Sequence, residues 1–273
     1  IELSRKNLLH NLSFFQKTVG PAEVMAVVKA NAYGHGLEQV AMVLKTTSLK
    51  WFGVDQLDEA LLLRRLGVRQ SIVVLGYIPI ERLHEAISKK ISFVLYTRSH
   101  LRALQRLTTR GRTAKVHLKI ETGLHRQGIE LDELPWFIRE LKKSPRIEVE
   151  GVSTHFANVE DVSEQSYARL QLKRFCEASD LLMKAGIHPR VRHASSSAAA
   201  TLLPEARFNL IRLGISLYGL WSSEEVERQT IENIVRRNKK TGRDPILKPV
   251  LTWKTVIAQC KKVKQGEPIS YGL

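Results

Sequence analysis

The stretch VMAVVKANAYGHG, Val24–Gly36, carries the pattern that decides the fold. Its first half is a short apolar run rich in β-branched residues, which is typical of a buried strand, and this run ends at Lys29. The residues that follow, ANAYGHG at 30–36, do not continue the apolar run. Similar short apolar runs recur along the chain, each followed by a polar or helical stretch. This repetition predicts a series of βα units.

Eight such runs occur in order, and helical patterns fill most of the gaps between them. The predicted strands are Val24–Lys29, Trp51–Val54, Ile72–Leu75, Ile91–Leu95, Ala114–Ile120, Ile147–Val152, Arg190–His193 and Phe208–Ile211. The predicted helices include one between Ser4 and Gly20, then Asp55–Leu66, Ser99–Leu107, Leu131–Lys143, Ser163–Ala185 and Ser197–Leu202. Eight βα units predict a (β/α)8 TIM barrel. An open doubly wound sheet is the alternative, but no glycine-rich dinucleotide loop follows the first strand.

The pattern changes after Trp221, so we expect three parts in the chain. Residues 1–221 are expected to form the barrel. Residues 222–246 are polar, basic and punctuated by glycine and proline, which predicts a linker or a long loop. From Leu247 apolar and polar residues alternate as in a strand. Residues 247–273 are therefore expected to begin a C-terminal β domain that this sequence leaves incomplete.

The composition indicates a cytoplasmic globular protein. The 273 residues include 43 Lys and Arg against 27 Asp and Glu, a formal net charge of +16. These cations are spread along the chain without a nucleic-acid-binding motif, which favours a solvated basic surface over a nucleic acid partner. Cys176 and Cys260 match no disulfide framework, redox spacing or metal-binding spacing, so no metal is expected. No signal peptide or membrane-spanning run is visible, and no membrane partner is expected.

Polar side chains cluster where the predicted strands end, and in a barrel these strand ends form one rim. The residues concerned are Lys29, Lys119, Arg126, His155, Ser197, Arg212 and Gly214. Each has a structural interpretation when taken alone, as a lysine reaching solvent, a surface charge, a core histidine or a helix cap. Their convergence on one rim favours a binding site.

This combination of residues suits pyridoxal phosphate better than other cofactors. Lysine amines form Schiff bases with carbonyl compounds, and Lys29 ends the first predicted strand. The serines at 195–197 precede or begin a short predicted helix, whose first amides and hydroxyl groups can hold a phosphate. Barrel enzymes often bind phosphate on the loops after strands seven and eight. The sequence therefore predicts a site that holds the cofactor by its aldehyde and by its phosphate.

The sequence resembles the alanine racemase family. Ala26–Gly36 closely matches that family's cofactor-lysine motif. Further segments resemble the family in its own order, at Lys119–Gly128, Ser153–Phe156, His193–Ala199, Asn209–Gly219, Leu247–Thr255 and Ser270–Gly272. The resemblance covers nearly the whole chain. Glu121 and Ser196 depart from it, since the family usually has Asp or Asn at the first position and often Asn at the second.

The resemblance implies pyridoxal 5'-phosphate as the cofactor and a role for each matching residue. Lys29 would hold the cofactor and act as one catalytic base, and Tyr271 would be the opposite base. The residues implied at the cofactor are Tyr33, Ser197, Gly214 and Ile215 at the phosphate, Arg212 at the pyridine nitrogen, His155 beside Arg212, and Arg126 at the phenolic oxygen. Arg126 would also contact the substrate carboxylate. Lys119 matches a position that is carbamylated in many members of the family.

The activity implied by the resemblance is the interconversion of L-alanine and D-alanine by this Lys/Tyr pair. It would supply D-alanine for peptidoglycan, in a homodimer whose subunits share their active sites. Two alternatives stay open: a racemase of another amino acid such as serine, and a non-catalytic pyridoxal-phosphate homeostasis protein. The last class is a single barrel without a β domain, so the strand pattern from Leu247 argues against it.

Overall fold

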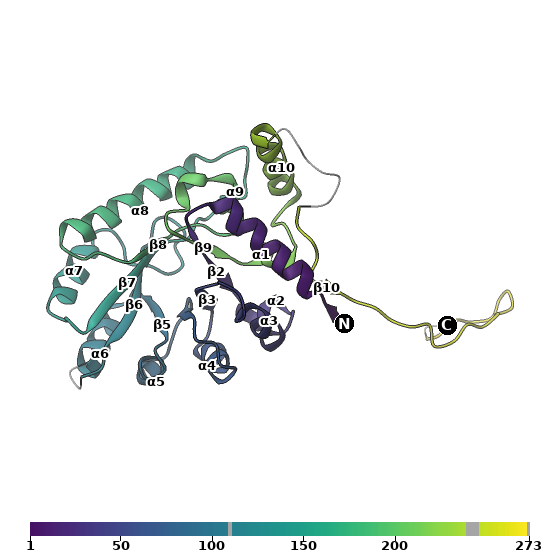
Figure 1. Ribbon diagram of the computed structural model, residues 1–273, viewed down its shortest axis with the longest axis horizontal. Coiled ribbons are helices and arrows are strands. Elements are labelled where there is room, and N and C mark those ends of the chain that lie inside the picture. Colours follow the sequence, from purple (N-terminus) through teal and green to yellow (C-terminus); the bar gives the residue numbers. More distant parts are fainter. Residues whose placement is uncertain (109–110, 239–245, 272–273) are drawn as a thin grey trace.

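The computed structural model describes residues 1–108, 111–238 and 246–271, and most of them build one barrel (Figure 1). Its eight parallel strands are β2 (Glu23–Val27), β3 (Trp51–Val54), β4 (Ser71–Val74), β5 (Ser92–Leu95), β6 (Ala114–Lys119), β7 (Ile147–Ser153), β8 (Val191–His193) and β9 (Leu210–Leu213). Strands β2 to β8 pair in sequence order, and β9 pairs with β2 on its other side. The backbone N–H of Arg212 donates to the carbonyl of Ser195 at 3.0 Å, which nearly closes the ring. The predicted TIM barrel is confirmed, and the doubly wound alternative, whose strand order reverses, is wrong.

Helices surround the barrel (Figure 1). They are α1 (Arg5–Val19), α2 (Lys29–Tyr33), α3 (Leu37–Leu44), α4 (Leu57–Arg65), η1 (Ile80–Arg82), α5 (Leu83–Ser88), α6 (Arg98–Thr108), α7 (Leu134–Lys142), α8 (Ser166–Lys184), α9 (Ser197–Leu202), η2 (Pro204–Ala206), η3 (Ile215–Tyr218) and α10 (Glu224–Asn238). Ser4 caps α1 as predicted, because its hydroxyl accepts the Asn7 N–H at 3.2 Å. Phe15 of α1, Phe137 of α7 and Phe175 of α8 are fully buried and bind these helices to the core.

The first strand ends earlier than predicted. Strand β2 stops at Val27, and Lys29 is the first residue of α2 rather than the last residue of the strand. The N–H of Val28 still donates to the carbonyl of Gly53 of β3 at 2.8 Å, so the chain follows the sheet to this point. It then turns away through residues 30–33, whose φ angles are all positive, between 51° and 55°. The apolar run did not reveal this turn because none of the four residues is glycine.

Helix α10 lies where a linker or loop was predicted at 222–246. The hydroxyl of Ser223 accepts the N–H of Val226 at 3.2 Å, and glutamates fill the first turn, where they suit the helix dipole. Only a narrow face of the helix, including Val226 and Thr230, is buried, so its composition resembles that of a loop. Residues 239–245 of the predicted linker lie outside the described residues.

The segment from Leu247 packs beside the start of the chain. Leu247 and Val250 are buried, and Leu251–Thr252 (β10) pairs antiparallel with Glu2–Leu3 (β1). The strand is shorter than the predicted alternation, since Trp253 is 84% exposed and the chain continues without regular structure to 271. The division into domains stays a prediction. Within the described ranges, no helix combines the length and the apolar character that crossing a membrane requires.

Candidate functional site

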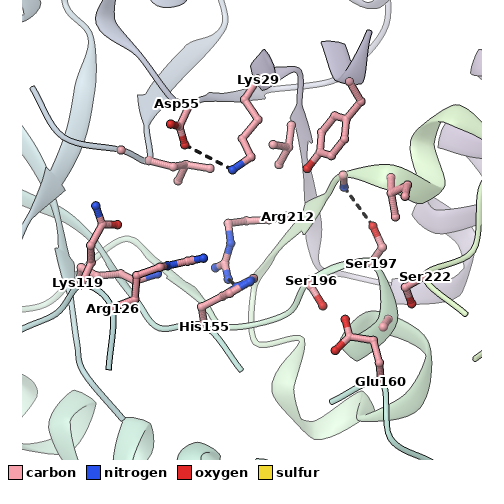
Figure 2. Close-up of a pocket in the computed structure, with 18 of the residues that line it drawn as sticks. Lys29, Asp55, Lys119, Arg126, His155, Glu160, Ser196, Ser197, Arg212 and Ser222 are labelled. Atoms are coloured by element: carbon pink, nitrogen blue, oxygen red, sulfur yellow. Dashed lines mark hydrogen bonds and ion pairs between the residues drawn. The ribbon is translucent and has the colours of Figure 1, made fainter. Parts of the chain in front are cut away.

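A pocket of about 720 Å³ lies at the carboxyl ends of the barrel strands, and Figure 2 shows its lining. Nine of the ten residues predicted for the site line it, namely Lys29, Tyr33, Lys119, Arg126, His155, Ser197, Arg212, Gly214 and Ile215. They come from α2, β6, β9, α9, η3 and the connections after β6, β7 and β9. Positions that are as many as 186 residues apart in the sequence, from Lys29 to Ile215, therefore meet in one cavity. Their individual roles stay predictions.

Tyr271 is the tenth predicted residue, and the structure does not bring it to this pocket. Its side chain is fully exposed. It lies on the extended C-terminal segment, which projects away from the barrel in Figure 1. Its role as a base at the cofactor of a partner subunit stays a prediction.

Lys29 enters the pocket from the first position of α2, directly before the left-handed turn at residues 30–33. Left-handed backbone costs about 1–2 kcal/mol per residue that is not glycine, so other contacts must hold the turn. The Asn31 carbonyl accepts the N–H of Gly36 at 3.0 Å, and its side-chain Oδ1 accepts the N–H of Leu37 at 2.8 Å. With the turn held, Lys29 Nζ lies 3.3 Å from Asp55 Oδ1, an ion pair drawn in Figure 2.

Three elements meet at the end of the pocket where a phosphate is predicted. The hydroxyl of Ser197 accepts the N–H of Gly214 at 3.0 Å (Figure 2). A Cβ on Gly214 would lie 2.7 Å from the Tyr33 hydroxyl oxygen, so any other residue here would force the tyrosine hydroxyl to move. Burial, and then the charge of Asp55, raise the pKa of Tyr33, which keeps its hydroxyl a hydrogen-bond donor. These hydroxyl groups and the amides at the start of η3 suit a phosphate group.

Arg212 lines the pocket as a buried cation, and its hydrogen-bond acceptors are uncharged. Its Nη1 donates to Nδ1 and to the carbonyl oxygen of His193, at 2.8 and 2.7 Å. Its Nη2 donates to the carbonyls of Thr154 and Ala194 and to Nδ1 of His155, at 2.8, 2.9 and 3.0 Å. Burial and the nearby Arg126 lower the pKa of Arg212 to about 10, so it stays charged at neutral pH. The result is a fixed positive charge facing a cavity.

His155 is held as a neutral acceptor beside Arg212. Burial, and then the charge of Arg212, lower its pKa to about 2. Because its Nδ1 accepts a hydrogen bond from Arg212, the ring proton resides on Nε2. His155 therefore orients Arg212 without adding a charge to the pocket.

Arg126 is presented by a loop that Glu121 organises. Glu121 Oε1 accepts the N–H groups of Gly123 and Leu124 at 2.6 and 2.7 Å, and its Oε2 accepts the N–H of Arg126 at 3.3 Å. Burial alone would raise the pKa of Glu121, but these amide donors outweigh it and lower the pKa. The glutamate that departs from the family pattern thus remains a charged anchor for the loop.

Lys119 lies at the end of β6 and faces the same cavity as Arg126. Burial, and then the charges of Arg212 and Arg126, hold the pKa of Lys119 well below its usual range. A lysine in these surroundings favours its neutral amine, which can act as a nucleophile.

Sequence reasoning missed several pocket residues, among them Asp55, Tyr77, Gln127, Glu160 and Ser222. Asp55 follows β3 directly, so the rule that assigned the other strand ends to the site would have found it. Glu160 and Ser222 lie on loops far from any strand end, and no local pattern marks them. Besides Lys119, three cationic side chains and two carboxylates line the cavity, which suits an anionic ligand.

The chain matches known proteins over most of its length. It matches the family model described as "Alanine racemase, N-terminal domain" over residues 3–222. It is 38% identical over 272 residues to the alanine racemase of Carboxydothermus hydrogenoformans, covering 99% of this chain and 70% of that protein. It is 34% identical over 275 residues to alanine racemase 2 of Caldanaerobacter subterraneus subsp. tengcongensis, covering 100% and 67%.

Solved structures agree with these sequence matches. The alanine racemase of Clostridium difficile 630 in complex with cycloserine superposes with a TM-score of 0.80 at 31% identity, covering 84% of this chain and 64% of that one. A histidine racemase from Leuconostoc mesenteroides subsp. sake gives a TM-score of 0.73 at 32% identity, covering 80% and 59%. This chain thus spans about 70% of the curated relatives named here and less than two thirds of these solved chains.

Proposed function

This chain belongs to the alanine racemase family, whose members depend on pyridoxal phosphate, and on that premise we propose that it racemises alanine. The observation that carries the proposal is the single pocket that holds Lys29, the Ser197–Gly214 contact and Arg212. These are a lysine amine, a site suited to phosphate and a fixed cation. The pocket volume of about 720 Å³ is adequate for a cofactor with a small amino acid.

The residues present fit pyridoxal phosphate. When bound, the cofactor supplies an aldehyde for a lysine amine and a ring that withdraws electrons from the α-carbon of an amino acid. Lys29 would hold the aldehyde carbon, while Tyr33, Ser197 and the backbone amides of Gly214 and Ile215 would hold the phosphate. Arg212 would face the pyridine nitrogen. With a pKa near 10, Arg212 retains its proton at neutral pH and can only donate a hydrogen bond there.

The acid–base chemistry is proposed to be divided between two residues on opposite faces of the substrate. Racemisation removes a proton from one face of the α-carbon and returns a proton to the other. We assign one face to Lys29 and the other to Tyr271 of the partner subunit, with Arg126 at the substrate carboxylate. This division requires a homodimer. The D-alanine formed would supply peptidoglycan synthesis in the cytoplasm.

Proton exchange in deuterated water tests this proposal. The protein, loaded with pyridoxal phosphate, is incubated with L-alanine, and α-deuteration is followed by proton NMR while D-alanine is measured with a coupled oxidase. We expect both products from the parent protein and from K173A, which removes an exposed lysine, but neither from K29A. Y271F is expected to lower the racemisation rate at least about a hundredfold. A loaded protein that exchanges no α-proton would contradict the proposal and favour a binding protein.

The same assay tests the substrate. Histidine and serine are supplied in place of alanine, because one structural relative is named a histidine racemase. We expect the largest kcat/KM with alanine. A larger value with either of the other two amino acids would overturn the assignment of substrate while leaving the racemase chemistry in place.

Lys119 is proposed to carry a carbamate. Its lowered pKa favours the neutral amine, which can add to carbon dioxide by forming an N–C bond and releasing a proton to water. The resulting anion would lie beside Arg126 and orient its guanidinium. Growth with ¹³C-labelled bicarbonate should give a carbamate resonance in the parent protein. Persistence of that resonance in K119A would contradict the assignment.

A further inference from the structure

A column of hydrogen-bonded side chains runs inside the barrel from Arg212 away from the pocket. Arg212 Nη1 donates to His193 Nδ1 at 2.8 Å, and His193 Nε2 lies 2.8 Å from His117 Nδ1. His117 Nε2 in turn lies 3.4 Å from Glu150 Oε2. The two imidazoles are fully buried and Glu150 is 3% exposed. The four members come from β9, β8, β6 and β7, so the column crosses the interior of the barrel.

The two ends of the column fix the direction of every hydrogen bond in it. A guanidinium can only donate, so His193 must accept on Nδ1 and carry its proton on Nε2. His193 then donates to Nδ1 of His117, which places the second ring proton on Nε2 as well. That proton points to Glu150, and an ionised carboxylate can only accept. Both imidazoles are therefore Nε2–H tautomers, and no other arrangement satisfies both ends.

Charge is confined to the two ends of the column. Burial lowers the pKa of His193 and the pKa of His117, so both rings stay neutral at neutral pH. Burial alone would raise the pKa of Glu150, but hydrogen bonds from His117 and Ser92 outweigh it and lower that pKa to about 2. Glu150 also accepts from Lys115 at 3.2 Å and from Arg190 at 3.4 Å. A buried carboxylate thus lies two neutral rings away from a buried guanidinium.

The backbone is shaped to admit this column. Strand β7 pairs Val149 with Val116 and Gly151 with His117, so Glu150 is an extra residue in the ladder. Such a bulge redirects a side chain, and here it places a glutamate among buried groups. A Cβ on Gly151 would lie 2.4 Å from His117 Nδ1, so glycine at this position leaves room for the imidazole. Trp51 packs edge-on against the same ring, with 5.7 Å between centroids.

We propose that His193 and His117 are positioning residues that link Glu150 to Arg212, and that Glu150 is the remote counter-ion of that guanidinium. The neutral partners that touch Arg212 orient it but do not balance its charge. The aligned dipoles of the two imidazoles transmit the field of the carboxylate to it. The existence of the column does not depend on the cofactor. Its effect on the cofactor rests on the proposed function of the pocket.

The tautomers test the column without any cofactor. In protein labelled with ¹⁵N-histidine, long-range ¹H–¹⁵N correlation spectra distinguish the Nε2–H tautomer, the Nδ1–H tautomer and the cation. We expect the resonances of His117 and His193 to show the neutral Nε2–H form throughout pH 5.5–8.5. An Nδ1–H tautomer or a protonated ring at either position would overturn the proposal.

Two glutamates of β7 offer a matched pair for the counter-ion role. Lys115 pairs with both Glu148 and Glu150, but only Glu150 contacts His117. In the loaded protein, E150Q is expected to lower the pH midpoint of the cofactor absorbance change by about half a unit, because a negative charge is lost from the site's surroundings. E148Q is expected to leave the midpoint unchanged.

The possible outcomes distinguish a failure of the counter-ion role from a failure of the proposed function. No shift in E150Q, or an equal shift in E148Q, would overturn the counter-ion role. Failure of the parent protein to bind pyridoxal phosphate would instead contradict the proposed function, and the histidine tautomers would still decide whether the column exists. If E150Q does not fold, the histidine spectra of the parent protein still test whether the column exists.

Discussion

At the scale of single residues, short polar contacts between distant loops define the pocket. Lys29 meets Asp55 at 3.3 Å, and Gly214 meets Ser197 at 3.0 Å. Each contact joins residues from different βα units. A small shift of one loop therefore displaces a side chain of another. The glycine at 214 is the most constrained of them, because its missing Cβ is the space that Tyr33 uses.

Replacing Gly214 with alanine should therefore weaken cofactor binding. The φ of Gly214 is −102°, so alanine brings no left-handed strain, and the expected damage is the contact with the Tyr33 hydroxyl. We expect an increase of about tenfold in the Kd for pyridoxal phosphate, measured by absorbance titration. The same substitution in a Y33F background, where that hydroxyl is absent, should cost less than about twofold. An equal cost in both backgrounds would contradict the steric explanation.

The residues of the site could be predicted largely because strand ends of a barrel share one rim. Lys29, Arg126, His155 and Arg212 were found in this way, and the structure places all four in one pocket. The rule cannot reveal contacts inside the barrel. His117 lies within β6 and was not singled out. Its contact with Glu150 depends on a bulge in β7, and that bulge leaves no pattern in the sequence.

At the scale of elements, the left-handed turn at residues 30–33 is the least expected feature. Its four residues are Ala, Asn, Ala and Tyr, although glycine suits positive φ better. The eight strands were predicted close to their observed positions because β-branched runs identify buried parallel strands. This turn was missed because its positive φ angles depend on contacts rather than on local preference. Helix α10 was missed because it buries only a narrow face, so its polar composition resembles that of a loop.

Ala30 allows the cost of this turn to be measured, because its side chain is exposed and its φ is 51°. A30G should raise the free energy of unfolding by about 1 kcal/mol, since glycine adopts positive φ without the penalty. The control is A185G, at a partly buried alanine whose φ is −81° and where glycine should destabilise the fold slightly. Urea denaturation measures both. Destabilisation by A30G would contradict the backbone assignment of the turn.

At the scale of the whole molecule, buried neutral histidines link stability to pH. His117, His155 and His193 have lowered pKa values in the folded protein, and that of His155 is about 2. Below pH 6.5 the unfolded chain binds protons that the folded chain does not. The stabilising contribution of these three neutral histidines is therefore complete above about pH 6.5, and it is lost progressively as the pH falls toward 2.

The free energy of unfolding should consequently decrease between pH 6.5 and pH 4.5. Each of the three histidines contributes a limiting slope of about 1.4 kcal/mol per pH unit. Urea denaturation at a series of pH values measures the total slope. H155Q should reduce that slope by about a third, while H84Q, at an exposed histidine, should leave it unchanged. A parent protein whose stability is constant over this range would contradict the neutral, buried state of these rings.

The proposed activity depends on Lys29 as the residue that holds the cofactor, and chemical trapping tests this assignment most directly. Protein loaded with pyridoxal phosphate is reduced with borohydride, digested, and the pyridoxyl group located by mass spectrometry. We predict one labelled site, Lys29, and no stoichiometric labelling in K29A. A label on Lys119, which lines the same pocket, or labels distributed over exposed lysines would contradict the assignment of Lys29.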